Sequence, residues 1–80
     1  MITIDNIDSN AVQTINVDEE TSIVSITFKS SGKEYNYALN GISPQDFVNT
    51  VNEKIQNKTS VGRFVNKSIR EDQTLQIMAV

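Results

Sequence analysis

Cationic side chains, which can bind anions such as phosphate, are concentrated in one part of this 80-residue chain. Five of its seven Lys and Arg residues fall within a stretch of 17 positions that holds no acid: Lys54, Lys58, Arg63, Lys67 and Arg70. The rest of the chain has two basic residues and all ten acids, and the net charge is −3. This segregation indicates either a surface that binds the phosphates of a nucleotide or nucleic acid, or the solvated face of a helix.

The segment KTSVGRFVNKSIR, residues 58–70, has helical spacing. Arg63, Lys67 and Arg70 stand at i, i+4 and i+7, which places them on one helix face. The apolar residues fall on the opposite face: Val61, Phe64, Val65 and Ile69. The sequence therefore predicts a helix with a core face and a cationic face, ending near Arg70 and capped by Thr59 or Ser60.

The start of this helix is a candidate anion site. The first N–H groups of a helix have no partner within it and point toward a bound anion. Gly62 would let a ligand approach the backbone closely. Three phosphate contacts give weak and salt-sensitive binding, so a symmetric oligomer that multiplies the basic face is the more credible binder.

Two tyrosines are the other candidate ligand contacts. Tyr35 and Tyr37 would stack on bases if they lie on an exposed sheet face. They also alternate with Leu39, which favours core burial with hydroxyls at the rim. The candidate ligand-binding residues are therefore Lys58, Ser60, Gly62, Arg63, Lys67, Arg70, Tyr35 and Tyr37.

Most side chains that perform catalysis are missing from the sequence. It has no His, Cys or Trp, which removes the commonest general base, the thiol nucleophile and nearly all zinc sites. The glycines at 32, 41 and 62 are too dispersed for a phosphate-binding loop. The acidic triplet at 18–20 lacks the ligand spacing of a calcium loop. We expect a non-enzyme without a cofactor or a metal.

The elements that must position the basic face begin with strands. Residues alternate between apolar and polar, with β-branched and aromatic side chains, around the Gly-containing break at 30–32. The predicted strands are Thr14–Val17, Ile23–Lys29, Lys33–Leu39 and, more weakly, Leu75–Val80. Between them, Ser43 as N-cap and Pro44 at the first position predict a helix over Pro44–Gln56.

The order β-β-β-α-α-β indicates an α+β fold, a small antiparallel sheet with two helices packed on one face. Residues 1–80 form one domain, with a core over 9–70. The segment 74–80 either returns to the sheet or pairs with another subunit, since an apolar edge strand left open invites aggregation. Because a domain of this size is marginally stable, we expect a homo-oligomer that uses the sheet edges at Ile2–Ile4 and Leu75–Val80.

The chain shows neither the pattern of a signal peptide nor an apolar run long enough to span a bilayer. The sequence therefore predicts a soluble, cytoplasmic protein with no membrane partner.

The order of motifs resembles the KTSC domain, a short module found at the C-terminus of some lysyl-tRNA synthetases and as stand-alone bacterial and phage proteins. The resemblance covers about residues 9–70. It rests on Asp18, Phe28, Gly32, Tyr35-x-Tyr37, Pro44, Phe47 and the closing signature Ser60-x-Gly62-x-Phe64-x-Asn66-x-x-Ile69-Arg70. Val17 departs from it, because the family usually has an aromatic residue there.

The synthetase association of that family implies RNA binding. Small phage proteins also include sponges that sequester nucleotide immune signals, and a phage-encoded protein would act in the host cytoplasm and evade host defence. Two functional hypotheses follow. One is a non-catalytic module that binds phosphates of a nucleotide or nucleic acid; the other is a symmetric protein–protein interaction or structural module without a nucleotide ligand.

Overall fold

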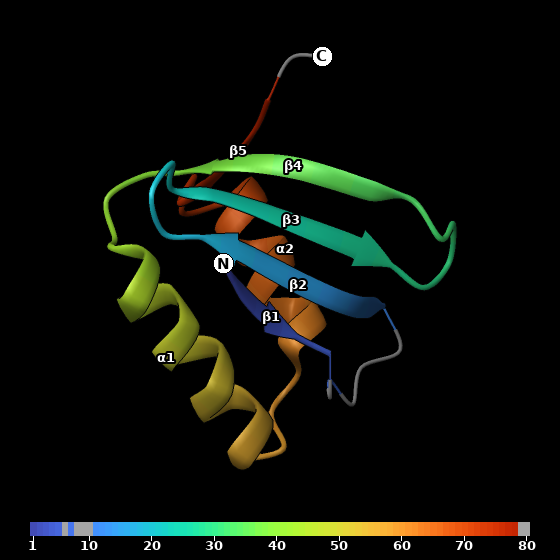
Figure 1. The fold of residues 1–80 in the computed structure, drawn as a ribbon. Helices are drawn as coiled ribbons and strands as arrows, with labels where there is room; N and C mark the ends of the chain where they lie inside the picture. Colours follow the sequence, from blue (N-terminus) through green and yellow to red (C-terminus); the bar gives the residue numbers. More distant parts are fainter. Residues whose placement is uncertain (6, 8–10, 79–80) are drawn as a thin grey trace.

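Two helices pack on one face of a five-stranded antiparallel sheet (Figure 1). The computed structural model describes residues 1–5, 7 and 11–78. In chain order its elements are β1 (Ile2–Ile4), β2 (Val12–Asp18), β3 (Ile23–Phe28), β4 (Glu34–Leu39), α1 (Pro44–Gln56), α2 (Val61–Arg70) and β5 (Leu75–Ile77). The predicted α+β class and the placement of both helices on one face are confirmed.

The strands lie in the sheet in chain order, from β1 at one edge to β5 at the other, and all neighbours are antiparallel. β1 to β4 form a meander, and β5 joins beside β4 after the two helices. The C-terminal strand therefore returns to its own sheet, which is one of the two fates expected for it. The strand ends at Ile77, and residues 79 and 80 of the predicted strand lie outside the described residues.

β1 is the strand that the predicted order lacks, although Ile2–Ile4 was expected to form a sheet edge. Ile2 lies opposite Val17 and Ile4 opposite Ile15, and Ile4 is buried. Three residues are too few for alternation to be distinguished from chance, so the sequence pattern alone does not define this strand. The observed order is β-β-β-β-α-α-β.

Alternation along the strands gives the sheet one apolar and one polar face. The buried strand residues point toward the helices: Ile4, Val12, Ile15, Val17, Val24, Ile26, Tyr37, Leu39 and Leu75. On the other face, a polar row crosses four strands and consists of Thr3, Asn16, Ser25 and Asn36. The Ser25 hydroxyl donates to Asn36 Oδ1 at 2.6 Å. Among the described elements, no helix covers this polar face (Figure 1).

Each helix begins at a serine cap, as the sequence predicts. Ser43 Oγ accepts the Asp46 N–H at 3.1 Å, and Ser60 Oγ accepts the Arg63 N–H at 3.1 Å. Such a cap satisfies a backbone donor that the helix itself leaves without a partner. Below the sheet, the helices bury Phe47, Val48, Val51, Val61 and Val65. Periodicity and caps together therefore fix where both helices begin and which face each one buries.

A tight turn joins the two helices. The N–H and the hydroxyl of Thr59 both donate to the Lys54 carbonyl, at 2.9 and 3.1 Å, which closes the end of α1. Lys58 has a φ of 55°, the left-handed conformation that usually belongs to Gly at this place in a helix terminus. The turn brings α2 beside α1, so that α1 contacts β2 while α2 contacts β5.

Candidate anion-binding site

A cleft lies between the two helices, next to the turn that joins them. This interhelical cleft has a volume of about 500 Å³ and is lined by Thr50, Lys54, Thr59, Ser60, Arg63, Phe64, Lys67 and Asp72. Its ionisable lining consists of three cations and one carboxylate, Asp72. Cations that gather along the walls of a cleft focus a positive potential there, so the interhelical cleft favours an anion.

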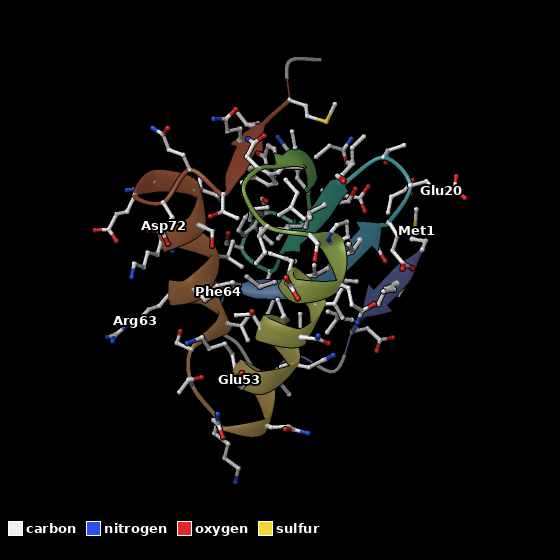
Figure 2. The ribbon with its side chains drawn as sticks, turned by 90° about the vertical axis from the view of Figure 1, so that its left-hand side faces the viewer. Met1, Glu20, Glu53, Arg63, Phe64 and Asp72 are labelled. Carbon is white, nitrogen blue, oxygen red and sulfur yellow. The ribbon has the colours of Figure 1, made fainter. Side chains whose placement is uncertain are left out.

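Phe64 supplies the aromatic surface of the interhelical cleft and lies between α1 and α2 (Figure 2). Its ring packs against that of Phe47, with centroids 5.7 Å apart and planes inclined by 36°. Lys54 Nζ lies 5.9 Å from the Phe64 centroid, within the range of a cation–π interaction. Because Phe47 is fully buried, it fixes Phe64 from the core side, and Phe64 in turn keeps the Lys54 ammonium at the cleft.

The hydroxyls of the cleft are already engaged with the backbone. Thr50 donates to the Asp46 carbonyl at 2.9 Å, and Thr59 donates to the Lys54 carbonyl at 3.1 Å. The Ser60 oxygen accepts the Arg63 N–H. These hydrogen bonds hold the helix ends. Because Ser60 Oγ only accepts, its O–H can still donate to an anion, together with the ammonium and guanidinium groups of Lys54, Arg63 and Lys67.

A second hollow adjoins the interhelical cleft along the outer side of α2. It has a volume of about 420 Å³ and is lined by Arg63, Asn66, Lys67, Arg70 and Glu71. Arg63 and Lys67 line both hollows, so one set of cations spans them. We call Lys54, Arg63, Lys67 and Arg70 the basic surface. Figure 2 shows Arg63 pointing outward from α2, away from α1.

The structure brings four of the predicted site residues together. Ser60, Arg63 and Lys67 line the interhelical cleft, and Arg70 lines the adjoining hollow. Lys58 lies apart in the turn, where it lines a smaller hollow of about 190 Å³ with Ile55, Thr59 and Val61. The cationic face expected for the second helix is therefore present, and the predicted contribution of Lys58 is displaced from it.

Gly62 is not placed as expected. It is buried, in the same face of α2 as Val61 and Val65, so it packs toward the core and does not admit a ligand to the backbone. In addition, the Arg63 N–H is taken by Ser60 Oγ. The start of α2 thus offers fewer free backbone donors than the sequence suggests, and the site depends on side chains.

The two tyrosines lie outside the interhelical cleft, on the helix-facing side of β4. Tyr37 is only 5% exposed and lies opposite Val24, whereas Tyr35 is 38% exposed and packs edge-on against Phe28, with centroids 5.9 Å apart. Burial raises the pKa of the Tyr37 phenol, and the neighbouring Tyr35 adds a smaller effect. Tyr37 is therefore part of the core, and neither tyrosine ring lies next to the basic surface.

Sequence reasoning missed the cleft itself. The sequence places Lys54 among the clustered cations without indicating that it lines a site, and the spacing of Phe64 indicates only a core position. Their proximity arises because the turn folds α2 back against α1, and no local spacing encodes that contact. Thr50 and Asp72 enter the cleft lining for the same reason.

Comparisons of the chain with protein-family models, with curated proteins and with solved structures found no match. The resemblance to the KTSC domain therefore stays a prediction that rests on the motif residues. In the described part of the chain, no helix has the length and apolar character needed to cross a membrane. Nor do the described His, Cys, Asp and Glu side chains include a group of three or more that could hold a metal ion.

Proposed function

We propose that the protein is a non-catalytic module that binds the phosphates of a nucleotide or nucleic acid at its basic surface. The observation that carries the proposal is the interhelical cleft, where Lys54, Arg63 and Lys67 line one hollow beside Phe64. Cations hold phosphates, and an aromatic face beside them suits a base.

The expected binding is weak for one copy and depends on salt. For single-stranded nucleic acid, log K falls against log[salt] with a slope of about −0.7 per phosphate contact, so three contacts give a slope of about −2. A mononucleotide occupies the interhelical cleft alone, whereas a nucleic acid would also cover Arg70 in the adjoining hollow. The two sources of phosphate are therefore distinguishable by the residues on which binding depends.

The test is a fluorescence-anisotropy titration of labelled UTP and of a labelled oligouridylate over a salt series. Replacing Arg63 and Lys67 together by Gln should weaken binding of both ligands at least about tenfold and flatten the salt slope, because each residue contacts phosphate. Arg70→Gln should weaken only the oligouridylate. Equal effects on both ligands would assign Arg70 to the nucleotide site as well.

The matched control replaces Lys29 and Lys33 together by Gln. Both lysines are exposed at the turn between β3 and β4, away from the basic surface, and the change in net charge is the same. We expect this variant to bind almost as tightly as the unaltered protein. If it loses as much affinity as the Arg63 and Lys67 variant, net charge explains the binding and the proposed site is wrong.

The resemblance to the KTSC domain supports this function, because the synthetase association of that family implies RNA. The analogy with phage sponges supports a related role, in which the protein holds a nucleotide signal without converting it. Such a role needs no catalytic residue and would be exercised in the cytoplasm, that of the host if a phage encodes the protein. Stoichiometric release of intact ligand on denaturation would distinguish binding from turnover.

A second candidate function is a symmetric protein–protein interaction module without a nucleotide ligand. The observation that favours it is the exposed apolar surface at the last strand of the sheet: Ile77 of β5 is 65% exposed, and Met78, which follows the strand, is 38% exposed. Exposed apolar side chains on an edge strand suit a protein partner. Light scattering of ligand-free protein tests it: a mass above that of one chain, unchanged by nucleotide, would favour this candidate over the first.

A further inference from the structure

β5 leaves backbone hydrogen-bonding groups open along one side. The Thr74 carbonyl accepts the Asn40 N–H, and the Met78 N–H donates to the Asn36 carbonyl, so these residues turn their backbone groups toward β4. Backbone groups alternate in direction along an antiparallel strand. The N–H and C=O groups of Leu75 and Ile77 therefore point away from β4, beyond which the described sheet has no further strand.

This edge lacks the features that normally prevent strand pairing. Residues 74–78, Thr-Leu-Gln-Ile-Met, contain no charge and no proline, and charge and proline are the usual protection of an exposed edge. At the opposite edge, β1 buries Ile4 and half-buries Ile2, so it exposes less apolar side-chain surface than β5, where Ile77 is 65% exposed. Antiparallel pairing of two β5 strands would bring no charged residues of the strands together and would cover the exposed Ile77 of both copies. The partner that suits β5 is therefore a second copy of this chain.

The basic surface lies on the same side of the molecule as the β5 edge. α2 contacts β5, and Figure 2 shows Arg63 pointing outward from α2 on the side of the sheet where β5 lies. Lys67 and Arg70 follow on the same helix face, one and two turns further along. Antiparallel pairing of two β5 strands would therefore set the two α2 helices beside each other under one continuous sheet.

We propose that two copies pair through β5 and that one oligonucleotide binds across the two basic surfaces that this pairing brings together. The proposal rests on the proposed function and deepens it, because it names the ligand class as a phosphodiester chain longer than one nucleotide. A chain of about 4–16 nucleotides matches the site sizes of small single-strand-binding domains. A mononucleotide reaches only one interhelical cleft.

The cations of the basic surface couple pairing of the two copies to binding of the oligonucleotide, so that each favours the other. In such a pair, the α2 cations Arg63, Lys67 and Arg70 of the two copies would lie closer together than in separate copies, so their repulsion would oppose pairing in the absence of ligand. An oligonucleotide that neutralises both sets removes the repulsion and stabilises the pair, and by linkage the pair binds the oligonucleotide more tightly than one copy does. Added salt should likewise strengthen pairing of the ligand-free protein.

The decisive experiment measures mass by analytical ultracentrifugation, and affinity by anisotropy, for the full chain and for Ile77→Lys. The probes are UTP and an oligouridylate of about 12 nucleotides. We expect the oligouridylate to double the mass of the unaltered protein, and UTP to leave it unchanged. Ile77→Lys should keep the mass of one chain and bind the oligouridylate about tenfold more weakly, with unchanged affinity for UTP. Because the substitution adds a cation, a loss of affinity for an anion has to come from lost pairing.

The controls separate this proposal from the proposed function. Gln13→Lys adds the same charge at an exposed position of the inner strand β2, and should pair and bind like the unaltered protein. Circular dichroism checks that both variants fold. If Ile77→Lys still doubles in mass with the oligouridylate, pairing through β5 is wrong even when Arg63 and Lys67 prove necessary for UTP. If replacing Arg63 and Lys67 leaves the affinity for UTP unchanged, the proposed function is wrong, and the proposed coupling of pairing to binding is wrong with it.

Discussion

At the scale of single residues, Lys58 is held in a conformation that few side chains adopt. Its φ of 55° lies in the left-handed region, where a Cβ crowds the following carbonyl. The turn requires this geometry, because the N–H groups of Lys58 and Thr59 both close the end of α1, on the carbonyls of Ile55 and Lys54. Glycine would take the same conformation without the steric penalty.

We therefore expect Lys58→Gly to stabilise the fold by about 0.5–1 kcal/mol, measured by urea unfolding. Lys58→Ala is the matched control, since it removes the same charge but keeps the Cβ, and it should not be stabilising. Because Lys58 lies apart from the basic surface, Lys58→Gly should also leave UTP binding intact. A destabilised glycine variant would show that the side chain contributes a contact that outweighs the strain.

Ionisation of the Asp18 carboxyl group makes the free energy of unfolding depend on pH. Its carboxylate accepts the Glu20 N–H at 3.0 Å and the Thr21 N–H at 3.4 Å, and these bonds, led by that of Glu20, hold the pKa of Asp18 below its ordinary value of 3.8. A carboxyl group with a lowered folded-state pKa adds stability at any pH above the unfolded value. That stability is lost as the pH falls through the folded-state pKa.

We expect Asp18→Asn to be less stable than the unaltered protein at neutral pH, and the two stabilities to converge as the pH falls through the lowered pKa of Asp18 and both side chains become uncharged. Urea unfolding across that range measures the difference, and an NMR titration of the Asp18 carboxyl confirms the direction of its pKa shift. A constant gap between the two proteins at every pH would assign the effect to the turn geometry and not to ionisation.

At the scale of elements, the N-cap of α2 has two separable roles. Ser60 satisfies the Arg63 N–H and also lines the interhelical cleft. Aspartate caps a helix as well as serine does, and its charge interacts favourably with the start of the helix. The same charge would lie among the cations that hold the anion. One substitution thus changes stability and binding in opposite directions.

We expect Ser60→Asp to keep or raise the melting temperature and to weaken UTP binding about tenfold, whereas Ser60→Ala should lose about 1 kcal/mol of stability. Ser43→Asp is the control, because it makes the same change at the cap of α1, which does not line the interhelical cleft. It should preserve both stability and binding. Equal loss of binding in both aspartate variants would indicate a general charge effect.

The sequence predicts the features that depend on local contacts, and it does not predict those that depend on contacts between distant segments. Ser43 with Pro44, and Ser60 with the apolar face that follows it, are local signals, and they locate α1 and α2. β1 has three residues, too few for a pattern, and is defined only by its pairing with β2. The interhelical cleft depends on Lys54, Phe47 and Phe64 meeting across a turn, a tertiary contact that no spacing reveals. Gly62 is buried in α2, and the sequence does not distinguish a helix glycine that serves close packing from one that gives a ligand access to the backbone.

At the scale of the whole molecule, β5 closes the core although it has only three residues. Leu75 is fully buried and lies opposite Leu39, whereas Ile77 on the same face is mostly exposed. The contribution of this strand to the core therefore rests on one side chain. Removing residues 74–80 altogether would lose that side chain together with the pairing edge, so point substitutions are the sharper test of each.

We expect Leu75→Ala to destabilise the fold by about 2–5 kcal/mol, because it leaves a cavity under the sheet. Ile77→Ala, a change of similar size at an exposed position, should stay within about 0.5 kcal/mol of the unaltered protein. Urea unfolding at low protein concentration, where copies do not pair, measures both. Similar losses of unfolding free energy for the two variants would mean that, in the unpaired protein in solution, Ile77 is buried against other parts of its own chain.

The late position of β5 in the chain also sets the order in which the protein is completed during synthesis. β4 ends at Leu39, and its partner strand begins only at Leu75, after both helices. While the ribosome produces residues 40–74, the nascent meander carries an open edge at β4, and Tyr37 and Leu39 are without the strand that lies beside them in the finished fold. Any pause in translation within the helices would prolong that exposure. The emergence of β5 then covers the β4 edge, and the open edge of the sheet moves to β5.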